Sequence, residues 1–233
     1  MLRTSVRIIA TLGLLGCNAD SISFGQSEDR TFEVTLTNLS DAQPISPGVF
    51  VLHDNSFSLF AGGEAASAGI QAIAESGDPS VAVAELSGAP GIGAVVASDE
   101  PAHRVGGSGS QSVIVTLTAD DDHTRLSMAT MLICTNDGFV SARSLPVPTG
   151  TAGLIEVDLV AYDAGTEANS ESAGDIVPPC WSLGPVSGPA GGSGRTAEGG
   201  TVALHQGVTE SGDLSAAHRW TSPAARITIR RIE

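Results

Sequence analysis

The sequence predicts an all-β protein built as an antiparallel β-sandwich with one short helix. Several short segments alternate apolar and polar residues with a period of two, as half-buried strands do. Residues typical of turns (Gly, Pro, Asn and Asp) separate these segments, and only one stretch has apolar residues at helical spacing. Many short strands with one helix favour two packed antiparallel sheets.

The predicted strands follow one another along the whole chain after a polar N-terminal stretch. The segment 31–37 is the clearest case, because Phe32, Val34 and Leu36 point to one face and the intervening residues to the other. The segment 126–134 is apolar almost throughout, which is typical of a strand buried on both faces. The remaining predicted strands are 48–53, 57–60, 112–118, 153–161 and 225–232.

One helix is predicted over residues 64–75, where the chain is rich in alanine and its apolar residues recur at helical spacing. A Gly-Asp-Pro turn at 77–79 ends it. The next apolar run, 81–86, fits a strand or a helix, and periodicity does not decide between them. Residues 177–200 are rich in Gly, Pro and Ser and predict a long surface loop, since a strand follows them.

Composition excludes some classes of function. The 233-residue chain has no lysine, so every strongly basic side chain is an arginine, and its net charge is −15. Such a surface repels nucleic acid and anionic membranes, so neither is an expected partner. The acidity suits divalent cations, or it only maintains solubility.

Motifs typical of enzymes are missing from the sequence. The five histidines lack the spacing of a zinc site, and no Gly-x-Ser-x-Gly motif is present, so we do not expect an enzyme.

The first residues are typical of an export signal. Arg3 and Arg7 form a short basic region, and 8–15 is an apolar run too short to span a bilayer. The following Leu-Leu-Gly-Cys resembles a bacterial lipobox, in which Cys17 would receive the lipid. The alternative is an ordinary secretory signal that happens to contain a cysteine.

The lipobox reading divides the chain into three parts. We expect a signal peptide at 1–16, a lipid-anchored tether at 17–31 and one domain at 32–233. Acyl chains on Cys17 would hold the protein at a membrane surface. Because Asn18 follows the cysteine, the expected location in a cell with two membranes is the outer membrane or the cell surface.

Two cysteines remain after Cys17, namely Cys134 and Cys180. An even pair in an exported protein suggests a disulfide. The alternative is two buried thiols, which are common in protein cores.

Carboxylates follow two of the predicted strands. Asp137 comes just after the buried strand 126–134, and Asp163 and Glu167 come just after the strand ending at 161. Calcium prefers oxygen ligands clustered in turns, and glycines beside these acids permit tight backbone turns. If the two strands run in the same direction, the three carboxylates converge on one cation. The alternative is two unrelated solvated turns, and Glu171 is expected to be a solvated acid.

Five segments together resemble a known family. They are FEVTLTNLSDAQPISPGVFVLHD, FSLFAGGEAASAGIQAIAESGD, LSMATMLICTNDGFVSA, YDAGTEANSE and ARITIRRI, and they follow one another in this order. This arrangement is similar to the spondin domain, which is shared by F-spondin, mindin and a set of bacterial exported proteins. The resemblance covers residues 32–233.

The resemblance implies a β-sandwich related to C2 domains, with one divalent cation, Ca²⁺ in the first place, held at one end. Its ligands would be Asp137, Asp163 and Glu167. Two departures from the animal members stand out: Gly138 replaces an aromatic residue, and Glu167 replaces an aspartate and reaches one methylene further.

The expected function is that of an exported, lipid-anchored, calcium-binding module for adhesion or ligand binding at the cell surface. Its partner would be an extracellular protein or a glycan. The alternative is a structural envelope lipoprotein in which the cation only stabilises the fold.

Overall fold

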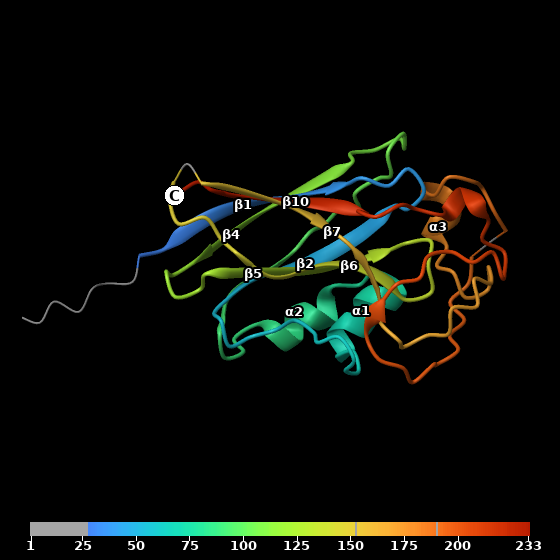
Figure 1. The fold of residues 1–233 in the computed structure, drawn as a ribbon, viewed down its shortest axis with the longest axis horizontal. Coiled ribbons are helices and arrows are strands. Elements are labelled where there is room, and N and C mark those ends of the chain that lie inside the picture. The colour runs from blue at the N-terminus through green and yellow to red at the C-terminus, as the bar shows by residue number, and fades with distance from the viewer. Residues whose placement is uncertain (1–27, 152, 190) are drawn as a thin grey trace, which may run out of the picture.

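The computed structural model of the chain describes residues 28–151, 153–189 and 191–233. It is a sandwich of two antiparallel sheets, so the predicted fold class is confirmed (Figure 1). One sheet has four strands in the order β4-β1-β10-β7, and the other has six in the order β3-β2-β5-β6-β8-β9. The strands are β1 Arg30–Asn38, β2 Ile45–His53, β3 Ile92–Ala97, β4 Ser112–Ala119, β5 Arg125–Leu132, β6 Gly138–Pro146, β7 Leu154–Leu159, β8 Ala161–Asp163, β9 Ala203–Leu204 and β10 Ala225–Arg231.

The main core lies between the two sheets and follows from the alternation in the strands. In β1 the apolar residues Phe32, Val34 and Leu36 are buried, while their neighbours are partly exposed. In register, Val34 of β1 lies opposite Ile229 of β10 and Val115 of β4, so one apolar row crosses three strands. Burial of this continuous face is the main force that holds the two sheets together.

Two helices cover the outer face of the six-stranded sheet (Figure 1). Ile70 and Ile73 of helix α1, Ala68–Ser76, pack with Val49 and Val51 of β2 in a second buried cluster. Strand β2 is therefore buried on both faces, which explains its nearly continuous apolar sequence.

Helix α1 spans Ala68–Ser76, later than the predicted start at 64. The Ser67 side chain accepts a hydrogen bond from the backbone of Ile70 and so caps the helix. Gly77 ends it with a left-handed backbone, φ 66°.

The structure contains two more short helices. Helix α2, Ser80–Leu86, settles the ambiguity of the run 81–86 in favour of a helix. Helix α3, Pro179–Leu183, lies in the segment 177–200, where the prediction of a loop throughout was wrong. Pro179 at its first turn needs no backbone N–H there, so a Pro-rich segment can still begin a helix. A 3₁₀ turn at Ala216–His218 is the last helical element of the described residues.

A disulfide between Cys134 and Cys180 fastens α3 to the end of the sandwich. Both cysteines are buried in a third apolar cluster, and His218 is buried beside them. The cluster also contains Ile133, Ile176, Val208 and Leu214. The segment after β8 is therefore packed onto the sandwich.

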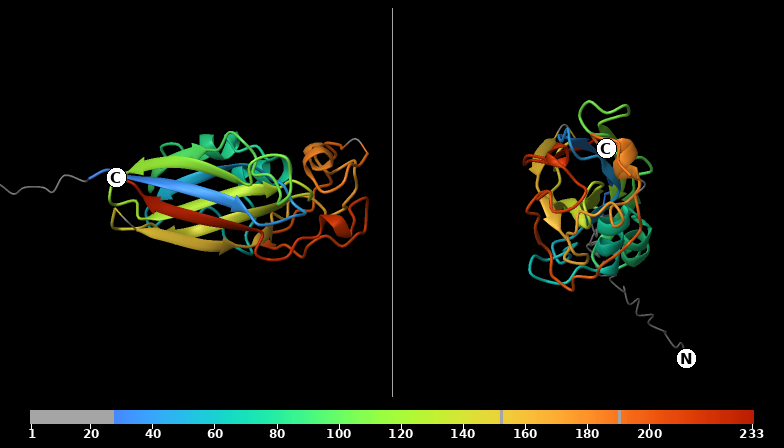
Figure 2. Two further views of the ribbon diagram at one scale, coloured as in Figure 1. Left: turned by 90° about the horizontal axis from the view of Figure 1, so that it is seen from above. Right: turned by 90° about the vertical axis from the view of Figure 1, so that its right-hand side faces the viewer.

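The two ends of the sandwich differ. The first described residues and the C-terminus lie at one end, and α3 with the loops between β8 and β10 lies at the other (Figures 1 and 2). Residues 30 and 31, predicted as part of the tether, already belong to β1, which extends the domain by two residues. The predicted signal peptide 1–16 and Cys17 lie outside the described residues.

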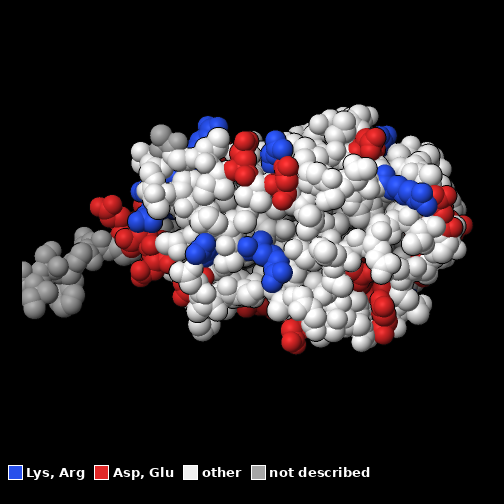
Figure 3. Space-filling view, viewed as in Figure 1, with Lys and Arg blue, Asp and Glu red and all other residues white. Residues whose placement is uncertain are grey.

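The distribution of charged side chains and the length of the helices are relevant to the predicted partners. On the face drawn in Figure 3, acidic side chains and arginines lie next to one another in several places, and much of the remaining surface is uncharged. Among the described residues, no helix has the length and apolar character needed to cross a membrane.

Candidate functional site

Sheet pairing brings the two predicted acidic loops to the same end of the sandwich. Strands β5 and β8 both pair with β6 in antiparallel fashion, so they run in the same direction and end on the same side. Gly138, at the start of β6, lies opposite Asp163, at the end of β8. Asp137 directly precedes Gly138, and it therefore stands beside the loop that follows Asp163.

Asp137 organises that loop through one of its two oxygens. Its side chain is 0% exposed. Oδ2 accepts hydrogen bonds from the backbone N–H of Thr166 at 2.8 Å and of Glu167 at 3.0 Å. The Thr166 hydroxyl donates to the same oxygen at 3.2 Å. The other oxygen, Oδ1, is buried and has no hydrogen-bond partner among the described residues.

Asp163 shapes the start of the same loop. Its Oδ1 accepts a hydrogen bond from the backbone N–H of Gly165 at 2.7 Å, and its Oδ2 accepts one from Asn169 Nδ2 at 2.6 Å. Gly165 has a φ of +68°, and a Cβ there would lie 2.5 Å from the backbone nitrogen of Thr201. Only glycine meets both conditions at low cost, which is why this residue follows the aspartate so closely.

Glu167 contacts Asn136 and Arg195. It is 1% exposed, and its Oε1 accepts a hydrogen bond from Asn136 Nδ2 at 3.1 Å. Its Oε2 lies 3.4 Å from Nε of Arg195, which also lies 3.5 Å from a carboxylate oxygen of Glu75. No hydrogen bond to Oε2 is present in the described part of the chain.

The electrostatics of the site disfavour two negative charges. Burial, and then the charge of Asp163, raises the pKa of Asp137 to about 6. Burial raises the pKa of Glu167 to about 7, although Asn136 and Arg195 act in the opposite direction. Two buried carboxylates with raised pKa values, one of which has a buried oxygen without a hydrogen bond among the described residues, are a place where a cation would be stabilising.

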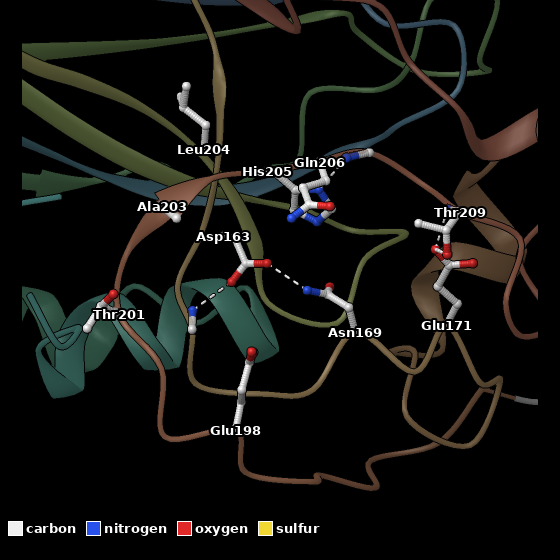
Figure 4. Close-up of a pocket in the computed structure, with 12 residues that line it drawn as sticks. Asp163, Asn169, Glu171, Glu198, Thr201, Ala203, Leu204, His205, Gln206 and Thr209 are labelled. Carbon is white, nitrogen blue, oxygen red and sulfur yellow. Dashed lines mark hydrogen bonds between the residues drawn. The ribbon is translucent and has the colours of Figure 1, made fainter. Parts of the chain in front are cut away.

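A polar cavity of about 310 Å³ opens beside Asp163. Figure 4 shows Glu198 pointing into it from the side opposite His205, with Asp163 and Asn169 between them. His205 Nδ1 accepts a hydrogen bond from the Gly207 backbone at 2.9 Å, so Nε2 carries the proton of the neutral ring. This Nε2 is buried and has no partner among the described residues. Burial lowers the pKa of His205, against the nearby charges of Asp163 and Glu171.

Asp137, Asp163 and Glu167 lie at the same end of the fold, but their carboxylate oxygens do not converge on one position. Among the described residues, the group of three side chains close enough to share a metal is Cys134, Cys180 and His218, within 4.8 Å of one another. Since a disulfide joins those two cysteines, their sulfurs are not free thiolates. At the acidic end, the carboxylate and amide oxygens fit a hard cation such as Ca²⁺. Asp137 Oδ1, which is buried and has no hydrogen-bond partner among the described residues, supports that fit.

The expectation that Glu171 is a solvated acid was wrong. Glu171 is 5% exposed, and its Oε1 accepts hydrogen bonds from the backbone N–H and the hydroxyl of Thr209 at 2.5 and 2.9 Å. Its Oε2 accepts one from the Ser211 backbone at 2.9 Å. Burial by itself would raise the pKa of Glu171, but these hydrogen bonds lower it. The residue therefore fastens the 209–211 segment to the acidic loop.

The side chains that join the site from the second half of the chain carry no signal in the sequence. Arg195 and His205 are far from the acidic loops in sequence and lie in irregular segments. No periodic pattern marks them. A signal existed only for Asn136, which stands beside Asp137 in the quoted loop.

These observations define a class: a single antiparallel β-sandwich with an acidic loop cluster at one end. A comparison with family models matches residues 43–173 to the spondin N-terminal domain, and the chain belongs to this family. Membership indicates a domain of the extracellular type. The match includes Asp137, Asp163 and Glu167 but not Arg195 or His205. A search of curated proteins found no match.

Proposed function

We propose that this protein is an exported, lipid-anchored spondin domain that binds one Ca²⁺ and presents a ligand-binding or adhesive surface. The observation that carries the proposal is Asp137 Oδ1, a fully buried carboxylate oxygen with no hydrogen-bond partner among the described residues, next to the charge of Asp163. A buried carboxylate oxygen of this kind is costly unless a proton or a cation compensates it.

Asp137 and Asp163 would hold the cation, with Glu167 as the third carboxylate. Bound Ca²⁺ would supply a fixed double positive charge between the loop before β6 and the loop after β8. Such a crosslink stabilises the folded state by RT ln(1 + [Ca²⁺]/Kd), or ~2.7 kcal/mol at a hundredfold excess over Kd.

The location of the site supports a role in binding. The chain enters the fold at β1, at the end of the sandwich opposite α3 and the acidic loops (Figure 2). A lipid on Cys17 would place the entry end toward the membrane and turn the acidic loops outward. The cavity of about 310 Å³ beside Asp163 lies at that outward end and would contact an extracellular protein or a glycan. In this proposal the protein binds its partner and does not act as an enzyme.

Thermal unfolding in Ca²⁺ and in EDTA tests the cation. We expect a higher Tm with Ca²⁺, and we expect Asp163→Asn to abolish the difference. Asp41→Asn, a change at an exposed aspartate, should keep it. Equal Tm values for the folded wild type with and without Ca²⁺ would refute the proposed cation.

The second candidate function is a structural envelope lipoprotein in which the cation only stabilises the fold. Asp137 favours it, since that one side chain already ties two loops together. Asp163→Ala separates the two candidates. If the protein is a binding module, the variant loses attachment to its partner at a temperature where it is still folded. If the cation is only a structural crosslink, the variant loses stability and keeps attachment.

A further inference from the structure

Arg195 is placed at the acidic site by contacts with several parts of the fold. One guanidinium nitrogen, Nη2, donates a hydrogen bond to the backbone carbonyl of Glu75, at the end of α1, at 2.5 Å. Another, Nη1, donates to the carbonyls of Asp175 at 3.3 Å and of Gly194 at 2.8 Å. The side chain is 26% exposed, so its charge is only partly solvated. These contacts fix the guanidinium independently of any bound ion.

Nε of Arg195 faces Glu167, the longest of the three proposed ligands. Glu167 Oε2 lies 3.4 Å from this nitrogen, and Oε1 is held by Asn136. Both oxygens are thus directed to partners other than Asp137 and Asp163. For Glu167 to coordinate a cation at the acidic loops, Oε2 must leave Arg195. A divalent ion close to a guanidinium would also be repelled by it.

We propose that Arg195 is an internal competitor of the cation for Glu167 and thereby determines the cation affinity of the site. The inference rests on the proposed calcium binding and assigns a role to a residue outside the matched family segment 43–173. In the cation-free protein the guanidinium neutralises Glu167. In the cation-bound protein Glu167 turns to the ion and gives up its pair with Arg195.

The length of Glu167 is essential to this competition. An aspartate at this position would be shorter by one methylene, so its carboxylate would withdraw from a guanidinium that already lies 3.4 Å away. The same change keeps a carboxylate on the loop that Asp137 organises. Shortening Glu167 and neutralising Arg195 should therefore act on the same interaction.

Calorimetric titration with Ca²⁺ tests the proposal on the wild type and on Arg195→Gln. We expect the variant to bind Ca²⁺ about fivefold more tightly or better, the lower limit of typical coupling between sites. Arg226→Gln is the matched control, because it makes the same change in net charge at an exposed pair with Asp158. It should change the affinity by less than about twofold.

Glu167→Asp gives an independent arm that removes none of the backbone contacts of Arg195. It should raise the affinity as Arg195→Gln does, and the double variant should not add the two effects, because both remove one interaction. Additive effects, or an affinity that falls in Glu167→Asp, would overturn the competition.

The outcomes separate this inference from the proposed function. If the wild type binds Ca²⁺ and Arg195→Gln binds no better than Arg226→Gln, the competition is wrong and calcium binding stands. If none of these proteins binds Ca²⁺ while folded, both proposals fall. Binding by Arg195→Gln and Glu167→Asp with a silent wild type supports the competition and refutes calcium binding by the wild type.

Discussion

At the scale of single residues, the two carboxylate oxygens of Asp137 have different surroundings. One accepts three hydrogen bonds from Thr166 and Glu167, and the other is buried without a partner among the described residues. Oδ2 fixes the loop that carries Glu167. Oδ1 is buried without a hydrogen bond that would compensate its negative charge. In the proposal, Asp137 therefore has both a structural role and a role in binding the cation, and the amide of Asn would preserve the shape but not the charge.

The raised pKa values of Asp137 and Glu167 predict how stability depends on pH. An acid whose pKa is raised on folding stabilises the folded state below its unfolded pKa, and this contribution is lost as the pH rises through the folded pKa. The folded values are about 6 for Asp137 and about 7 for Glu167, up from 3.8 and 4.5. Without cation, these two residues should therefore lower the stability progressively as the pH rises from about 4 to about 7.

Urea unfolding in EDTA at pH 5 and pH 7.5 measures this effect. Asp137→Asn serves as the comparison, since it removes one of the two groups and isolates its contribution from those of all other acids. We expect the variant to lose less stability than the wild type between the two pH values. Ca²⁺ affinity should rise over the same interval, because the cation requires ionised carboxylates. A wild type and variant with the same pH dependence would contradict the assignment.

At the scale of elements, the disulfide holds the segment after β8 against the sandwich. Cys134 follows β5, and Cys180 lies in α3, with a sequence separation of 46 residues. On the chain-entropy estimate, a crosslink of this span stabilises the fold by about 4 kcal/mol. Replacing both cysteines with alanine should lower the free energy of unfolding by about that amount.

Denaturant unfolding of Cys134→Ala/Cys180→Ala against the oxidised wild type measures the loss. The control is the wild type under a dithiol reductant, which removes the bond without changing side-chain volume by a substitution. A loss of similar size in both is expected. Unchanged stability in both would show that packing around His218 and Ile176, rather than the crosslink, holds α3.

Some elements of the fold and of the site could be predicted from the sequence, and others could not. The strands with one buried face were predictable, because such burial imposes period two on segments such as 31–37 and 112–118. Strands β3, β6 and β9 were not predicted, and the strand predicted at 57–60 was wrong, because those residues form no strand. The acidic loops were predictable because each follows a recognisable strand. Helix α3 was not, since a Pro- and Gly-rich segment carries no helical periodicity. Arg195 and His205 reach the site only through long-range packing, which leaves no local pattern in the sequence.

At the scale of the whole molecule, the two ends of the sandwich have different roles in the proposal. The entry of the chain and its C-terminus lie at one end, and α3 with the loops between β8 and β10 lies at the other (Figure 1). Residues of these loops, among them Asp163, Glu198 and His205, line the cavity. An anchor at Cys17 would thus leave the proposed site free to meet a partner.

Cys17→Ser tests the anchor. Without the thiol that receives the lipid, the protein should move from the membrane fraction to the soluble fraction after a salt wash, and its Tm should stay unchanged. A variant of Asn18, which leaves the thiol in place, should remain with a membrane. Retention of Cys17→Ser in the membrane fraction would contradict lipid anchoring.

The central claim is that the acidic loops bind one divalent cation, and calorimetry of Ca²⁺ binding to the folded protein at pH 7.5 tests it most directly. We predict one ion per chain with a Kd no weaker than about 1 mM, the range of extracellular calcium modules. Asp137→Asn should abolish the binding, and Asp41→Asn should leave it intact. The absence of binding to a folded wild type, or equal binding by Asp137→Asn, would contradict the account.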